Sequence, residues 1–285
     1  MAGKQNITPE LRRWVIEQAQ AGCSADAVLS SMVKAGWQED VAIEALETTL
    51  TEHLATTKAT DAPAQQKPPV PEPDLTGSPL RIDLGDRQIR VTLAMTLPRV
   101  VVFDEFLSGE ECDALIAGAR ERMARSMTVE RQSGGEEINE ARTSTGMFYR
   151  RAENEVIARI EHRIARLVNW PVENGEGMQV LHYGPGAEYK PHYDYFDPAE
   201  PGTPSILKRG GQRVGTLVMY LNDPVRGGGT SFPDAGLVVS ARKGSAVFFS
   251  YDKPHPSTKT LHGGTPVEEG EKWVATKWLR QGVFV

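Results

Sequence analysis

The sequence predicts a small helical domain followed by a larger, mainly β domain with flanking helices. Three observations lead to this expectation. Apolar residues recur at helical spacing before residue 55, a proline-rich stretch follows, and short β-rich runs separated by turn residues dominate after Met178. Many short strands at such spacing favour a sandwich or a jelly roll, with the preceding helices packed on one outer face.

Residues 1–55 are expected to form a three-helix module. Thr8 and Pro9 provide the start of the first helix, and Gly36 ends the second. The stretch Lys34–Trp37 before the third helix loosely resembles ubiquitin-associated-like modules. Such a resemblance implies a protein partner for this module, and a stabilising or dimerising appendage is the alternative.

Residues 56–79 are expected to be a linker rich in proline and alanine. Six of the chain's nineteen prolines fall within Pro63–Pro79, where only Val70 and Leu75 are bulky and apolar. Such a stretch buries too little surface to offset the entropy lost on ordering. The linker leaves residues 80–285 as the second domain, and it helps to explain why hydrophobic residues make up only 39% of the chain.

Composition narrows the classes of partner. A net charge of −6 argues against a protein whose main task is to bind nucleic acid. No apolar run approaches the roughly 20 residues of a membrane span, and no apolar stretch of signal-peptide length lies near the N-terminus. The two cysteines, Cys23 and Cys112, are too few for a disulfide framework. We therefore expect no membrane association and a cytoplasmic location.

Two helices precede most of the strands expected in the second domain. Ser108 and Glu111 form a capping box that starts one helix, and a second helix is expected over Glu153–Asn169. The expected strands are 89–93, 99–103, Met178–Tyr183, Val214–Leu221, Leu237–Ser240, Ala246–Tyr251 and Trp273–Leu279.

The triplet His192-Tyr193-Asp194 is a candidate metal site. In a strand, residues i and i+2 point to the same side, so the imidazole and the carboxylate would converge. A second histidine from a neighbouring strand would complete a face of two histidines and one carboxylate. That face leaves three positions open, as non-haem Fe(II) requires to hold a co-substrate and dioxygen together. The alternative is an ordinary exposed strand end.

His262 and Lys272 strengthen the metal interpretation. The lysine follows the histidine by ten residues and opens an apolar, aromatic strand. An unpaired ammonium inside a barrel is costly unless an anion meets it. A dicarboxylate bound to the iron at one end would supply that anion at the other. The alternative for Lys272 is a solvated lysine at a strand edge, which is also the expectation for Lys277.

Several motifs occur together in one order and spacing. They are Tyr183–Phe196, Gly211–Val214, Met219–Asn222, Gly227–Thr230 and Glu271–Trp278, with Arg142-Thr143-Ser144 upstream. Over about residues 98–281, the chain resembles the prolyl 4-hydroxylase family of 2-oxoglutarate- and Fe(II)-dependent dioxygenases. The resemblance implies a double-stranded β-helix core, and it implies Fe(II), 2-oxoglutarate, dioxygen and ascorbate as cofactors.

The resemblance also implies roles for individual residues. His192, Asp194 and His262 would hold the iron. Lys272 would pair with the distal carboxylate of 2-oxoglutarate, assisted by Tyr183 and Thr230. Tyr189, Arg213 and Trp278 match positions that line the family's peptide-proline groove, where aromatic faces pack on the pyrrolidine ring and a guanidinium binds a carbonyl. Ordinary barrel packing is the alternative for these three.

Two positions depart from the family pattern. Gly229 stands where relatives commonly have glutamate, and Arg280 stands where some have a histidine beside the substrate. Neither is an iron ligand, and both leave the identity of the substrate open. Two long polar stretches, Val129–Ala141 and Asp197–Gly211, are candidate lids or substrate clamps.

The predicted activity is 4-hydroxylation of prolyl residues in a peptide or protein, with conversion of 2-oxoglutarate to succinate. The same chemistry on a small molecule such as a free amino acid is a second hypothesis. A non-catalytic sensing or binding module is a third. A zinc hydrolase with the same three ligands is disfavoured because it offers no role for Lys272.

Overall fold

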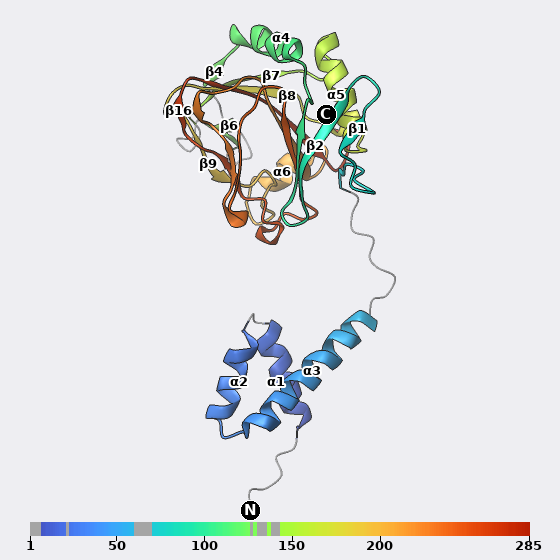
Figure 1. Cartoon of the computed structure of the whole chain (residues 1–285), viewed down its shortest axis with the longest axis vertical. Helices are drawn as coiled ribbons and strands as arrows, with labels where there is room; N and C mark the ends of the chain where they lie inside the picture. The colour runs from blue at the N-terminus through green and yellow to red at the C-terminus, as the bar shows by residue number, and fades with distance from the viewer. Residues whose placement is uncertain (1–6, 21–22, 60–69, 126–127, 130–135, 138–142) are drawn as a thin grey trace, which may run out of the picture. The chain divides into compact units, whose positions relative to one another are not determined.

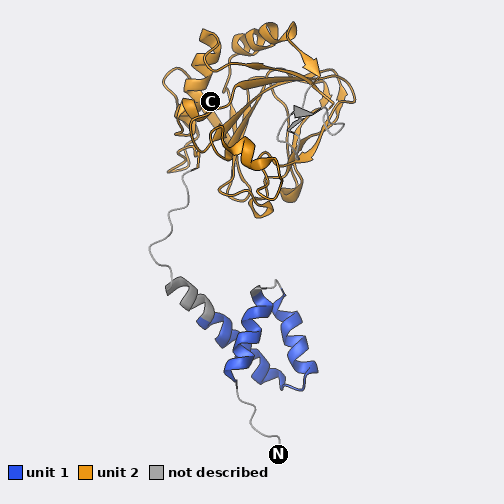
Figure 2. Cartoon of the chain, turned by 180° about the vertical axis from the view of Figure 1, so that it is seen from behind, with its two compact units in different colours: residues 1–67 blue, residues 68–285 orange. Residues whose placement is uncertain are grey.

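The computed structural model describes residues 7–20, 23–59, 70–125, 128–129, 136–137 and 143–285. The chain divides into two compact units, residues 1–67 and 68–285 (Figure 2). Each unit has its own hydrophobic core.

The first unit contains three helices, α1 (Pro9–Gln20), α2 (Ala25–Lys34) and α3 (Glu39–Ala59) (Figure 1). Ser24 caps α2 by accepting a hydrogen bond from the Ala27 amide. Val15, Met32 and Ala45 are among the residues that form the core between the helices. The third helix continues four residues beyond the expected end at residue 55. Within the described residues, no helix has both the length and the hydropathy needed to cross a bilayer.

Residues 70–79, which the sequence places in the linker, belong to the second unit and contact the rest of it. The Glu72 amide donates a hydrogen bond of 2.8 Å to the Val168 carbonyl, and the Glu72 carboxylate pairs with Arg99. Leu75 packs against the core of that unit. A proline-rich composition is also compatible with an extended segment fixed against a folded surface, so composition alone does not distinguish the two. The rest of the predicted linker, residues 60–69, lies outside the described residues.

A nine-stranded antiparallel sheet forms the larger layer of the second unit. In spatial order its strands are β1 (Arg81–Asp83), β2 (Gln88–Met95), β3 (Arg99–Asp104), β14 (Ala246–Ser250), β10 (Arg213–Tyr220), β17 (Lys272–Arg280), β8 (Met178–Tyr183), β7 (Thr145–Tyr149) and β4 (Ala124–Arg125).

A smaller four-stranded sheet forms the second layer, in the order β13 (Leu237–Val239), β12 (Thr230–Phe232), β15 (His262–Gly264) and β9 (Tyr189–His192). Two short pairs complete the strands: β11 (Arg226–Gly227) with β16 (Val267–Glu269), and β5 (Thr128–Val129) with β6 (Glu136–Glu137). The two main sheets and the flanking helices confirm the prediction of a mainly β, jelly-roll domain.

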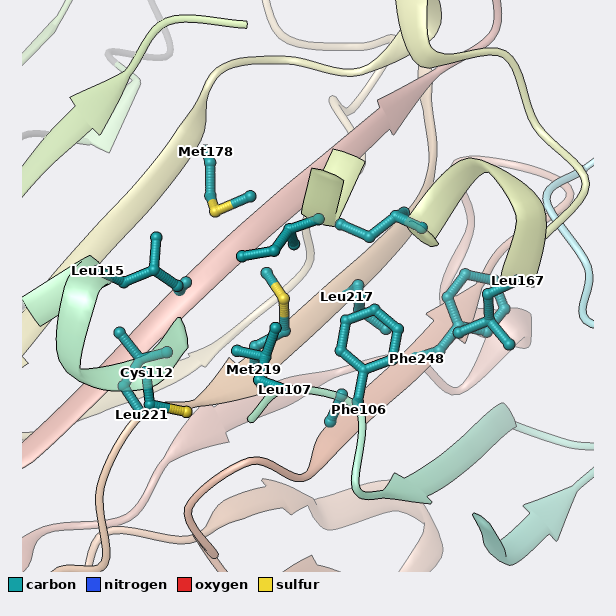
Figure 3. Close-up of a cluster of buried hydrophobic side chains, with 14 of the residues drawn as sticks. Phe106, Leu107, Cys112, Leu115, Leu167, Met178, Leu217, Met219, Leu221 and Phe248 are labelled. Carbon is teal, nitrogen blue, oxygen red and sulfur yellow. The ribbon is translucent and has the colours of Figure 1, made fainter. Parts of the chain in front are cut away.

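Two helices cover the outer face of the large sheet: α4 (Gly109–Arg120) and α5 (Glu155–Leu167) (Figure 1). The capping box of Ser108 and Glu111 is present at the start of α4, as predicted. Figure 3 shows Cys112 and Leu115 of α4 beside Met219 and the neighbouring apolar side chains of the sheet. The remaining helical turns are α6 (Thr203–Leu207), η1 (Val172–Asn174), η2 (Pro233–Ala235) and η3 (Pro256–Thr258).

Strand β17 divides its side chains between two environments. Trp273, Ala275 and Leu279 join the core on the helix side, whereas Val274 joins the core that includes residues of the small sheet. Because side chains alternate along a strand, Lys272 lies on the same face as Val274. The even-numbered residues of β17 therefore face the interior of the jelly roll.

Lys277 belongs to the opposite face, and the expectation of a solvated lysine is wrong. Its side chain is 2% exposed and pairs with Glu161 of α5. The strand that carries it is central in the sheet rather than at an edge, so this position lies under the helix layer.

Candidate active site

Three predicted metal ligands meet at the small sheet. His192 is the last residue of β9, and His262, the first residue of β15, is its direct cross-strand partner. Each of these histidines and Asp194 offers a ligand atom, and the three atoms lie within 4.8 Å of one another. The strand argument for Asp194 is wrong in detail, because β9 ends at His192 and Asp194 lies in the bend that follows.

The two histidines present the same nitrogen to Asp194. The Nε2 atom of His192 lies 3.5 Å from Asp194 Oδ1, and the Nε2 atom of His262 lies 3.5 Å from Oδ2. Each Nδ1 lies 3.0 Å from a backbone carbonyl, that of Lys190 for His192 and that of Thr260 for His262. A carbonyl oxygen only accepts, so Nδ1 carries the proton and the Nε2 lone pair is left for a metal.

Asp194 is buried and is held by a neighbouring strand. The Thr216 hydroxyl on β10 donates a 2.7 Å hydrogen bond to Asp194 Oδ2. Burial opposes ionisation of this carboxyl, but the two histidines and Arg213 lower its pKa below the usual range. Burial also lowers the pKa of His262, to about 4. The site thus holds a carboxylate beside the neutral imidazole of His262.

This donor set fits iron. Metal–nitrogen and metal–oxygen bonds of about 2.1 Å allow donor atoms 3.5 Å apart to contact one ion. Two imidazoles and one carboxylate form the set that non-haem Fe(II) oxygenases use, with positions left open for other ligands.

Lys272 is a buried cation without a counter-charge. Its side chain lies at the start of β17, and the residue is 4% exposed. Within the described part of the chain its Nζ forms no hydrogen bond or ion pair, and burial lowers the pKa of Lys272 to about 8. Its close neighbours include the rings of Tyr183 and Tyr220, with centroids 5.3 and 5.9 Å from Nζ.

Lys272 also lies close to the strand that carries His262. A Cβ placed on Gly264 would lie 3.6 Å from Lys272 Nζ, and Gly264 follows His262 by two residues on β15. Thr230 reaches this region through Tyr220, whose hydroxyl donates a 2.7 Å hydrogen bond to Thr230 Oγ1. An anion that binds iron at one end can therefore meet the ammonium of Lys272 at its other end.

The three predicted groove residues also lie beside the ligands. Tyr189 stacks on His192 with ring centroids 3.7 Å apart. The Arg213 guanidinium carbon lies 4.0 Å from the Trp278 ring centroid, and Trp278 is the cross-strand partner of Thr216. The structure thus gathers all nine predicted site residues around one interior.

Glu176 is a residue that the sequence analysis missed. Its carboxylate accepts hydrogen bonds from Arg213 Nε at 2.6 Å and Nη2 at 2.9 Å, and from Arg280 Nε at 2.6 Å. Arg213 therefore already has a bidentate partner, and its Nη1 lies 3.5 Å from the Asp194 carbonyl oxygen. Arg280 is 3% exposed and also donates to the Gly211 carbonyl, so it links the sheet to the loop before β10.

The surroundings of position 229 explain why it is occupied by glycine. A Cβ at this position would lie 2.9 Å from Val238 Cγ1 and 3.0 Å from the Val239 carbonyl oxygen. The family's glutamate would require strand β13 to move.

The structure describes few residues of the first candidate lid segment and all of the second. Of Val129–Ala141, only residues 129 and 136–137 are described, and Arg142 also lies outside the described residues. The segment Asp197–Gly211 contains α6, and the Thr203 hydroxyl donates to the Asp197 carbonyl at 2.6 Å. This second segment is a structured connection, and its role as a clamp stays a prediction.

Comparisons with known proteins agree with this geometry. A family model described as the 2OG-Fe(II) oxygenase superfamily matches residues 178–280. Prolyl 4-hydroxylase 5 of Arabidopsis thaliana is 44% identical over 209 residues, which cover 66% of this chain and 70% of that protein. Prolyl 4-hydroxylase 1 of the same plant is 45% identical over 201 residues, covering 65% of this chain and 69% of that protein.

A solved structure of a viral collagen prolyl hydroxylase from Paramecium bursaria Chlorella virus-1, in complex with 2-oxoglutarate, is 32% identical with a TM-score of 0.49. The match covers 64% of this chain and 95% of the viral chain. The sequence relatives confirm the resemblance found in the motifs. The chain belongs to the prolyl 4-hydroxylase family and is a 2-oxoglutarate- and Fe(II)-dependent dioxygenase.

Proposed function

We propose that this enzyme hydroxylates prolyl residues of a peptide or protein at the 4-position while converting 2-oxoglutarate to succinate. One observation carries the proposal: Lys272, a buried cation without a partner among the described residues, lies close to Gly264 on β15, the strand that begins with His262. The names of the sequence relatives support proline as the target residue.

The protein residues position the reactants. His192, Asp194 and His262 would hold the iron, with Thr216 keeping the carboxylate oriented. Bound iron, with 2-oxoglutarate and dioxygen, supplies the oxidising chemistry that converts an unactivated C–H bond to C–OH. Lys272 would hold the distal carboxylate of 2-oxoglutarate by donating a charge-assisted hydrogen bond to it in the buried interior.

The aromatic surroundings of the metal site support a prolyl substrate. Tyr189 and Trp278 offer flat faces on which a pyrrolidine ring can pack. Arg213 is fixed by Glu176, and its Nη1 lies 3.5 Å from the Asp194 carbonyl oxygen. Nη1 carries two N–H groups, so one of them can still donate to a peptide carbonyl. Dependence on ascorbate, a cytoplasmic location and a protein partner for the first unit stay predictions.

The test is an assay of succinate with Fe(II), 2-oxoglutarate and a library of proline-containing peptides. We expect peptide-dependent succinate formation together with the added mass of one oxygen atom on proline. Free proline and other free amino acids form the matched arm of the assay. Turnover of a free amino acid, with no oxygen added to any peptide, would contradict the proposal and support a small-molecule substrate.

A further inference from the structure

Phe148 is an exposed aromatic residue on a strand whose neighbouring residues are buried. It lies on β7 and is 47% exposed, whereas Met147 is 6% and Tyr149 3% exposed on the helix side. Alternation along the strand places Phe148 on the opposite face of the large sheet, the face that carries Trp278. The Phe148 and Trp278 ring centroids are 6.4 Å apart. Core packing does not account for a large aromatic side chain half open to solvent at this place.

A glycine at position 177 lies next to Phe148 and to the backbone of β7. Gly177 precedes β8, and a Cβ there would lie 2.7 Å from the Tyr149 carbonyl oxygen and 3.7 Å from Phe148 Cδ1. Any larger residue at position 177 would clash with the backbone of β7, whereas the contact with the Phe148 ring would be an ordinary one. Glycine therefore allows the chain before β8 to approach β7 beside Phe148.

Arg213 is a charged neighbour of Trp278: it stacks on the Trp278 ring and is paired with Glu176. Arg122 donates to the Phe148 carbonyl at 3.0 Å, but its guanidinium lies over the Tyr149 ring, on the helix side of the sheet. Because a carboxylate already balances the charge of Arg213, a ligand at this face needs no acidic group to pair with it.

Trp278 supplies a second, independent indication of a ligand. The residue is 7% exposed, and its Nε1–H has no hydrogen-bond partner in the described part of the chain. Leaving a buried donor unpaired costs free energy, so such a group is stabilised when a ligand supplies an acceptor. A peptide offers a carbonyl acceptor at every residue.

We propose that Phe148 and Trp278 together form a subsite for an extended peptide. In such a peptide, side chains two residues apart point to the same side and lie about 6.6–6.8 Å apart, close to the separation of the two rings. The target prolyl residue contacts Trp278, and an apolar side chain two residues away packs on Phe148. This inference rests on the proposed peptidyl hydroxylation and extends it to the sequence around the target.

The test compares two otherwise identical peptides with one proline. One has leucine and the other glycine at the positions two residues on either side. For the wild type we expect a KM for the leucine peptide about tenfold below that for the glycine peptide, since burying an apolar side chain of this size contributes about 1.5 kcal/mol. Phe148→Ala should abolish this preference while kcat and the KM for 2-oxoglutarate stay unchanged.

Two further variants separate a contact from a structural role. Phe148→Tyr keeps the ring and should retain the preference. Val225→Ala removes another exposed apolar side chain, 71% accessible, from a turn outside the site, and it should behave as the wild type. A preference that persists in Phe148→Ala would overturn the subsite. Equal weakening of both peptides in that variant would also overturn it, because the effect would then be structural.

Binding measurements separate failure of the subsite from failure of the proposed activity. If the wild type hydroxylates neither peptide, the proposed activity is contradicted for these sequences. Calorimetry can then still test the subsite, by comparing the dissociation constants of the two peptides. A leucine preference that Phe148→Ala removes supports it, and equal affinities in the wild type overturn it.

Discussion

Strand β17 carries buried cations at its two ends, and they differ in their partners. Lys272 at one end is 4% exposed, with no ion pair among the described residues. Arg280 at the other end is 3% exposed and is held by Glu176. Between them, on the opposite face, Lys277 is 2% exposed and is paired with Glu161.

The comparison shows that burial alone does not identify a functional cation. Burial lowers the pKa of Lys272 and of Lys277 alike, but only at Lys277 does a carboxylate oppose the shift. The paired cations fasten strands and a helix together. The unpaired one is stabilised when an anion enters, so it indicates a ligand site. Substitutions of the paired and the unpaired cations, and of the predicted metal ligands, test this distinction.

Replacing a metal ligand should have the largest effect. We expect His192→Ala to lower the rate of succinate formation by at least about a thousandfold, because the remaining two donors no longer hold iron in a defined position. His182→Ala is the matched control, since His182 is a half-exposed histidine paired with Glu271 outside the ligand set. Metal content and succinate formation are measured together. Full activity in His192→Ala would contradict the assignment of the ligands.

Lys277→Met should strongly destabilise the second unit. The change leaves the Glu161 carboxylate buried without its cation, which costs about 3–5 kcal/mol. Urea unfolding measures the loss in free energy of unfolding. Adding Glu161→Gln to Lys277→Met should recover much of that loss, because the amide oxygen can still accept from the Ala152 amide. No loss in Lys277→Met would contradict the structural role of the pair.

Lys272→Met should weaken the binding of 2-oxoglutarate without destabilising the second unit. Without 2-oxoglutarate, the variant should be at least as stable as the wild type, because it removes an unpaired buried charge. The KM for 2-oxoglutarate should rise about 10- to 100-fold, as expected for losing a charged hydrogen bond worth about 1.5–3 kcal/mol. Lys253→Met, at an exposed lysine, is the control and should leave that KM unchanged. If Lys272→Met were less stable than the wild type and its KM for 2-oxoglutarate were unchanged, Lys272 would have a structural role instead of a ligand-binding one.

The smallest expected effect is a dependence of 2-oxoglutarate binding on pH. The pKa of Lys272 in the free protein is lowered to about 8, so its side chain is protonated below pH 8 and loses its charge above it. Because the anion binds the charged form, the dissociation constant should be flat below pH 8. Above pH 8 it should rise by up to about tenfold per pH unit. Anaerobic calorimetry measures this, and Lys272→Met should abolish the slope.

The three residues that the sequence predicts as metal ligands lie close together in the structure, and each belongs to a motif of fixed local spacing. The physical argument for Asp194 was less successful, since the strand ends at His192 and a bend places the carboxylate. Residues 70–79 show the same limit. Their proline content indicated a linker, but contacts such as that of Glu72 with Val168 fix them to the second unit.

Glu176 shows what local reasoning cannot find. It lies between Gly175 and Gly177, a context that is typical of a turn. Its two partners, Arg213 and Arg280, come from two different strands. Only the pairing of β10 with β17 brings the three charges together.

The sequence was sufficient to predict the mainly β, jelly-roll class from the periodicity of its apolar residues, and the family from the order and spacing of its motifs. The residues that would hold the metal and the co-substrate are predictions of the same resemblance. The three-dimensional arrangement was needed to see which buried cations have partners, where Asp194 is held and which aromatic residues lie beside the two histidines. The reason is physical: strand alternation fixes the face on which a side chain lies, but sheet order and register, which join segments far apart in the chain, fix what that side chain meets.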